Sequence, residues 1–97
     1  MKPATLRVAY RIARNGNPDT LTAILPDVPA NPGNFVCYAH LGQHSECSHA
    51  WYRSTRPATK TEYKALAREL ESIYRPDYAL RIVQRISHAA VARANAS

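Results

Sequence analysis

The sequence contains little of what several protein classes require. It has only two cysteines and three glycines in 97 residues, too few for a secreted disulfide scaffold or for a glycine-rich loop that holds phosphate. No apolar run approaches the roughly 20 residues that span a bilayer, and no signal-peptide core follows Lys2. These absences predict a cytoplasmic protein with free thiols and no membrane partner.

The composition favours one small folded domain with an excess of positive charge. Hydrophobic residues make up 45% of the chain, as in ordinary globular domains. We expect a single domain over residues 1–86 and a flexible, alanine-rich tail over residues 87–97. Lysine and arginine number 13 against seven aspartates and glutamates, a formal net charge of +6. This excess favours an acidic partner, either a nucleic acid or an acidic protein surface.

Three segments in the first half of the chain have the residue pattern of β-strands. Residues 5–13 alternate between large apolar side chains and arginine or alanine, which is typical of a strand with one buried face. Residues 21–25 follow a turn at residues 15–18, so the first two strands are expected to form a hairpin. Residues 34–40 are rich in strand formers and predict a third strand. Residues 41–56 allow one further short strand or an ordered loop.

One helix is predicted between Pro57 and Pro76. Thr59 and Glu62 have the spacing of a capping box, and apolar residues follow at helical intervals. Alternation over residues 80–86 then predicts a last strand. The fold class is therefore α+β: an antiparallel sheet of about four strands with one main helix packed on one face, in the order β-β-β-(β)-α-β. The predicted core consists of Leu6, Val8, Tyr10, Leu66, Leu70, Ile73, Leu80 and Ile82.

Arginines recur on one side of the first and last predicted strands. If both assignments hold, Arg7, Arg11, Arg81 and Arg85 share the sheet face that the helix does not cover. One helix covers only part of such a sheet, so we expect residues 41–58 or a partner to cover the rest. These four arginines are candidate binding residues for an acidic macromolecule.

Five cysteine and histidine residues lie close together in the middle of the sequence. They are Cys37, His40, His44, Cys47 and His49. A zinc-stabilised module that uses the first four is one alternative, although the spacing matches no usual zinc finger. A small nuclease that uses His40 and His44 is another, although no orienting aspartate or asparagine stands near them. Neither alternative is preferred, so we expect no metal, no cofactor and no catalytic residue.

Several segments resemble a group of small uncharacterised proteobacterial proteins from prophages, plasmids and integrated elements. The segments are Y-x-H-x-G-Q-H-S at residues 38–45, T-R-P-A at residues 55–58 and E-Y-x-x-L-x-x-E-L at residues 62–70, and the similarity extends over residues 6–86. It implies an accessory protein of a mobile element. The matched positions add His40, Gln43, His44 and Arg56 to the candidate binding residues, and Gly42 to the turn between them.

The charge and the resemblance together favour a non-enzymatic binding protein. We expect it to act on an acidic macromolecule, a nucleic acid or a protein surface. The zinc-stabilised module and the histidine-dependent nuclease remain the alternatives from other functional classes.

Overall fold

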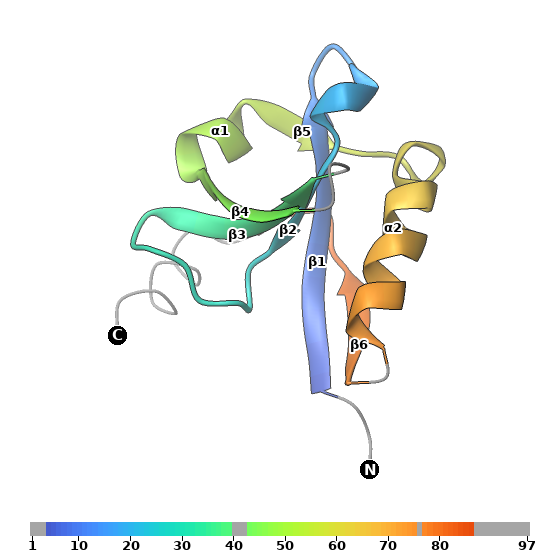
Figure 1. Ribbon diagram of the computed structural model, residues 1–97. Helices are drawn as coiled ribbons and strands as arrows, with labels where there is room; N and C mark the ends of the chain where they lie inside the picture. Colours follow the sequence, from blue (N-terminus) through green and yellow to red (C-terminus); the bar gives the residue numbers. More distant parts are fainter. Residues whose placement is uncertain (1–3, 40–42, 76, 87–97) are drawn as a thin grey trace.

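The computed structural model describes residues 4–39, 43–75 and 77–86, which form a mixed six-stranded sheet with one helix on each side (Figure 1). The predicted tail at residues 87–97 and the predicted turn residue Gly42 lie outside the described residues. The elements, in chain order, are β1 (Ala4–Ala13), β2 (Thr22–Leu25), β3 (Asn34–Ala39), β4 (Gln43–Ser48), α1 (His49–Arg53), β5 (Thr55–Pro57), α2 (Lys60–Tyr74) and β6 (Tyr78–Ile82).

The sheet confirms the predicted α+β class but has more strands than predicted, and one pairing is parallel. Its order is β4-β3-β2-β1-β5. Strands β5 and β6 lie along the same edge of β1: β6 pairs with its first half and β5 with its last residues. Antiparallel pairing holds except between β6 and β1, which are parallel. The parallel pair follows from α2, whose 15 residues span about 22 Å. The helix returns the chain to the start of β1, where Tyr78 pairs with Ala4.

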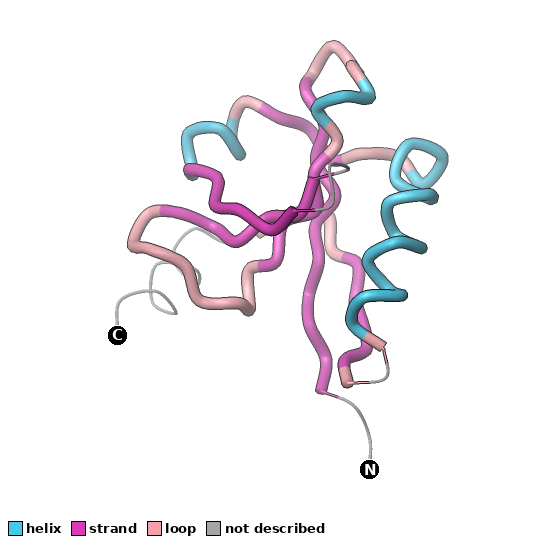
Figure 2. The backbone as a smooth tube through the Cα atoms, in the orientation of Figure 1, coloured by secondary structure: helices cyan, strands magenta, loops and turns pink. Residues whose placement is uncertain are grey.

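Strand β1 is the long strand that connects the sheet, because it pairs with β2, β5 and β6 (Figure 2). Its alternating residues separate two cores, whereas the sequence predicted only one buried face. Val8 and Tyr10 face α2, whereas Ala9 packs into a second cluster on the opposite side of the sheet. The two helices accordingly lie on opposite sides of β1 in Figure 1.

The core beneath α2 contains most of the predicted residues. Leu66 and Leu70 are completely buried against β1, and the Thr59–Glu62 capping box is present. Two predictions are wrong: Ile73 and Ile82 are 46% and 48% exposed. Ile73 lies at the edge of the helix face that carries Leu66 and Leu70, beside the half-buried Tyr74. Ile82 lies on a strand whose outer edge pairs with no other described strand.

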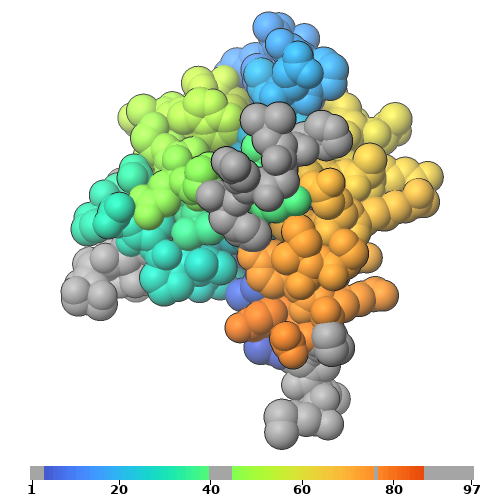
Figure 3. All heavy atoms as spheres, in the orientation of Figure 1, coloured from blue at the N-terminus to red at the C-terminus, as the bar shows by residue number. Residues whose placement is uncertain are grey.

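The other face of the sheet is covered by α1 and by the residues after β6. Figure 3 shows the surface of the molecule in the orientation of Figure 1, with the yellow-green atoms of α1 on the left and the yellow and orange atoms of α2 on the right. The predicted cover by residues 41–58 is confirmed, since Tyr52 of α1 packs there. The last strand ends at Ile82, not Ile86 as predicted. The chain turns at Val83, whose N–H donates to Val8 O, and Ile86 then enters the second core. No helix in the described part of the chain is long and apolar enough to cross a membrane.

Candidate anion-binding site

A cavity of about 520 Å³ opens where the end of β1, α1, β5 and the residues after β6 meet. Its described lining contains no aspartate or glutamate. The lining residues that carry a charge are all arginines: Arg11, Arg14, Arg53, Arg56 and Arg85. Such a concentration of one charge around one cavity makes it a candidate site for an anion.

Arg11 forms the floor of this cavity. Only 6% of the residue is exposed, although it carries a full charge. Its Nε donates to Thr55 Oγ1 at 2.9 Å, and its two terminal nitrogens donate to Thr55 O at 2.8 Å and Gln84 O at 3.1 Å. The guanidinium carbon lies 4.3 Å from the centre of the Tyr52 ring, a cation–π distance.

The charge of Arg11 has no carboxylate partner among the described residues. All three of its acceptors are neutral oxygens, and a guanidinium has five N–H groups, so two remain for a ligand. Burial lowers the pKa of Arg11, and the nearby charges of Arg14 and Arg85 lower it further. An arginine nevertheless stays protonated in proteins. Because buried charges are normally paired, the described part of the site lacks the negative charge that a bound anion would supply.

Local hydrogen bonds hold the walls of the cavity in place. Thr55 Oγ1 donates to Tyr52 O at 2.6 Å, which ties β5 to the end of α1. The Tyr52 hydroxyl accepts a hydrogen bond from the Ile86 N–H at 2.9 Å, which ties the segment after β6 to the same helix. Arg14, which follows β1, donates to Arg53 O at the end of α1 at 3.1 Å. The arginines are therefore brought together by tertiary contacts and not by proximity in sequence.

The rim arginines differ in how firmly they are held. Arg56 is fixed by two hydrogen bonds of 2.9 Å to the Glu62 carboxylate, and this contact, with the Thr59 backbone N–H, lowers the pKa of Glu62 to about 2. Arg53 and Arg85 are exposed, and no ion pair with a described carboxylate holds them. The site thus combines a rigid floor with two cations free to adjust to a ligand.

The structure brings together only part of the predicted arginine face. Arg11 and Arg85 line the cavity with Arg56, but Arg7 instead binds Asp27 through its backbone N–H and its guanidinium, at 2.8–3.0 Å. The expected open face is wrong for Arg11, because α1 and the residues after β6 cover it.

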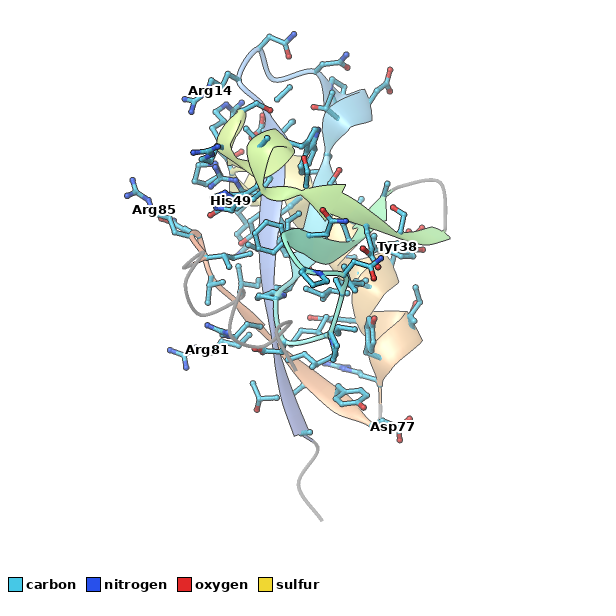
Figure 4. The ribbon with its side chains drawn as sticks, turned by 90° about the vertical axis from the view of Figure 1, so that its left-hand side faces the viewer. Arg14, Tyr38, His49, Asp77, Arg81 and Arg85 are labelled. Atoms are coloured by element: carbon cyan, nitrogen blue, oxygen red, sulfur yellow. The ribbon has the colours of Figure 1, made fainter. Side chains whose placement is uncertain are left out.

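Arg81 is exposed and stands opposite Arg7 in the β1–β6 register. Figure 4 shows Arg14, Arg81 and Arg85 projecting from one side of the molecule, whereas Tyr38 and Asp77 lie toward the other. Arg81 therefore extends the positive surface beyond the cavity without lining it.

The remaining predicted residues lie away from this cavity or outside the described residues. His40 lies outside the described residues. Gln43 and His44 begin β4, where their backbones pair with Ala39 and Tyr38, and their side chains are not among those described. Within the described residues, no three histidine, cysteine or acidic side chains are grouped to hold a metal ion. The zinc and nuclease alternatives that use His40 and His44 thus remain predictions.

Among the lining residues that sequence reasoning missed are Arg14, Arg53 and Thr55. Arg14 follows β1, where strand alternation no longer applies. The others lie in a segment for which no element could be predicted. The close spacing of Arg53 and Arg56 around Thr55 is the one local signal of the cavity. The sequence could not show its significance, because it depends on the pairing of β5 with β1.

Comparison with known proteins identifies no relative. No family model matches the chain. No curated protein and no solved structure matches it either. The resemblance to mobile-element proteins therefore stays a prediction, and the function must be argued from the cavity itself.

Proposed function

We propose that this protein binds the phosphate backbone of a nucleic acid at the arginine cavity, without catalysis, as an accessory protein of a mobile element. The observation that carries the proposal is the buried guanidinium of Arg11, which has spare donors, no described carboxylate partner and four further arginines around it. Guanidinium groups match the geometry of phosphate oxygens through paired N–H donors.

The surroundings of the cavity favour a nucleic acid over an acidic protein surface. Protein interfaces usually centre on an apolar or aromatic anchor that the partner covers. Here the apolar lining residues Tyr52 and Ile86 are only 7% and 8% exposed, because they already pack in the second core. What the cavity offers to a partner is charge, and exposed Arg81 continues that charge beyond the rim.

The same lining favours binding over cleavage. The described lining residues are arginine, tyrosine, threonine, proline and isoleucine. None of these types is the usual general base at neutral pH, a role that histidine and carboxylates fill most often. We infer that a phosphate accepts hydrogen bonds from Arg11 on the floor while Arg53 and Arg85 close on adjacent oxygens.

The test is a salt titration of binding to labelled single-stranded RNA, single-stranded DNA and duplex DNA, followed by fluorescence anisotropy. The logarithm of affinity should fall with the logarithm of salt concentration, by about 0.9 per duplex phosphate contact or 0.7 per single-strand contact. Arg85→Glu should weaken binding by more than tenfold and make the slope shallower by about one contact. Lys64→Glu is the matched control, because it makes the same charge change on exposed α2.

Two outcomes would overturn the proposal. Equal losses for Arg85→Glu and Lys64→Glu would show that net charge, not the cavity, drives binding. A dissociation constant weaker than about 10⁻⁴ M for every nucleic acid at physiological salt would exclude a nucleic-acid function. If poly-glutamate then bound tightly and Arg85→Glu abolished that binding, the partner would be an acidic protein.

A further inference from the structure

The two cysteines of the chain meet on neighbouring strands, although ten positions separate them in the sequence. In the β3–β4 register Cys37 stands opposite Ser45, and Cys47 stands opposite Phe35. Odd-numbered residues of both strands therefore share one face, which places the two thiols diagonally across the strand pair. This site lies on the β3–β4 part of the sheet, whereas β1, α1, β5 and the residues after β6 form the arginine cavity.

The two thiols interact with each other and with a neighbouring hydroxyl. Cys37 Sγ lies 3.3 Å from Ser45 Oγ and also forms a hydrogen bond with the Cys47 side chain. Those two hydrogen bonds outweigh burial and lower the pKa of the Cys37 thiol, while the pKa of Cys47 is raised because its thiol is the hydrogen-bond donor and is itself half-buried. The Cys37 thiol is therefore the more acidic of the two, which favours Cys37 as the attacking cysteine and Cys47 as the resolving one.

A second cavity, of about 410 Å³, gives a small molecule access to these sulfurs. Both cysteines line it, together with Thr22, Ser45 and Trp51. Cys37 is almost completely buried at its floor, and Cys47 is half-buried at its side. A compact disulfide could enter, whereas the thiol of another folded protein would not reach the floor.

We propose that Cys37 and Cys47 form a thiol–disulfide exchange site for a low-molecular-weight disulfide. The Cys37 thiolate attacks one sulfur of the small disulfide, which forms a mixed disulfide and releases one small thiolate. That thiolate takes the proton of Cys47. The Cys47 thiolate then attacks Cys37 Sγ and displaces the second small thiolate. The protein loses two electrons to the small disulfide, which becomes two thiols, and Cys37 and Cys47 become a disulfide.

The strand geometry predicts that this disulfide is strained and readily reversed. Diagonal neighbours on antiparallel strands lie about 7–8 Å apart at Cα, whereas disulfides usually span about 4.4–6.8 Å. Closure must draw β3 and β4 together locally, and strained disulfides are reduced more easily than structural ones. The site would therefore respond to the ratio of small disulfide to small thiol and would not lock the fold permanently.

The experiment uses glutathione disulfide as the probe and the full-length reduced protein, with a chelator in every buffer so that metal binding does not protect the thiols. After incubation, free thiols are alkylated and the mass is measured. We expect a monomer that has lost two hydrogens and has no alkylatable thiol, and its return to two thiols in millimolar reduced glutathione. Trp51, the single tryptophan, lines the cavity, so its fluorescence emission should change when the disulfide forms and again when it is reduced.

Two single variants separate the roles of the cysteines. Cys47→Ser should accumulate the mixed disulfide with one glutathione on Cys37, because no resolving thiol remains. Cys47→Ser keeps the Ser45–Cys37 hydrogen bond, which also lowers the pKa of the Cys37 thiol. Cys37→Ser leaves only the thiol of Cys47, so it should react more slowly than Cys47→Ser at pH 6.

Three results would overturn the proposal. The wild type could retain two free thiols at equilibrium with glutathione disulfide, or it could form only disulfides between molecules. Cys47→Ser could also fail to trap glutathione while its far-ultraviolet circular dichroism shows an intact fold. Equal rates for the two variants would refute Cys37 as the attacking residue.

Discussion

The floor of the arginine cavity depends on one buried hydroxyl, and its removal tests the arrangement directly. Thr55 is 2% exposed, and its Oγ1 accepts from Arg11 Nε at 2.9 Å while donating to Tyr52 O at 2.6 Å. Thr55→Val keeps the shape and the β-branch but replaces the hydroxyl with a methyl group. It leaves a buried charged donor and a buried carbonyl each without a partner.

The expected loss of stability follows from those two contacts. A hydrogen bond to a charged group contributes about 1.5–3 kcal/mol and a neutral one about 1 kcal/mol, so Thr55→Val should cost about 2–4 kcal/mol. For a domain of this size each kcal/mol shifts the melting temperature by about 4–8 °C. Urea unfolding followed by circular dichroism measures the cost directly, and equal denaturant slopes for variant and wild type validate the comparison.

A matched control distinguishes the hydrogen bonds from the general effect of valine in a strand. Thr5 lies on β1 and is exposed, so Thr5→Val should change stability by no more than about 0.5 kcal/mol. If Thr55→Val also costs less than about 0.5 kcal/mol, then Arg11 is not seated on Thr55 and the reasoning about the cavity floor fails.

Two further predictions concern α2. Leu70→Ala should cost about 2–5 kcal/mol in urea unfolding because Leu70 is fully buried, whereas Ile73→Ala, on an exposed position of the same helix, should cost under about 1 kcal/mol; equal costs would refute the assigned helix face. The Glu62 pKa is about 2 in the folded protein against an ordinary 4.5, so its stabilising contacts are fully present above pH 4.5 and are lost as the pH falls toward 2. The difference in stability between wild type and Glu62→Gln should shrink over that interval, and a difference that stays constant would refute the lowered pKa.

The parts of the fold that sequence could predict are those decided by local pattern. The alternation in β1 and the capping box with its apolar row in α2 are properties of neighbouring residues, and both were predicted correctly. The direction of β6 was not, because parallel or antiparallel pairing depends on where a 15-residue helix delivers the chain. Ile82 and Ile86 alternate as strand residues would, but tertiary contacts place them at an exposed edge and in the second core.

Only the positive charge of the candidate site and some of its arginines could be predicted from the sequence. The net charge of +6 indicated an acidic partner, and Arg11, Arg56 and Arg85 were among the residues proposed. That Arg11 is buried could not be predicted, since it depends on α1 and on the turn at Val83, each fixed by contacts distant in sequence. Burial changes the role of Arg11. On an open face it would be a solvated charge, whereas beneath Tyr52 it is a buried charge with no counter-ion among the described residues.

This difference gives the last prediction, in which stability and binding should respond independently. Removing the buried charge of Arg11 abolishes the cost of its desolvation, which should offset the loss of its three hydrogen bonds to neutral oxygens. Arg11→Met should therefore leave the unfolding free energy of the unliganded protein within about 1 kcal/mol of the wild type, unlike Thr55→Val, which keeps the charge and removes its partner. Nucleic-acid affinity should nevertheless fall by more than tenfold, because the cavity loses its floor donors. If Arg11→Met destabilises the protein as much as Thr55→Val while binding is unchanged, Arg11 is a structural residue and the anion does not bind where its charge is exposed to the cavity.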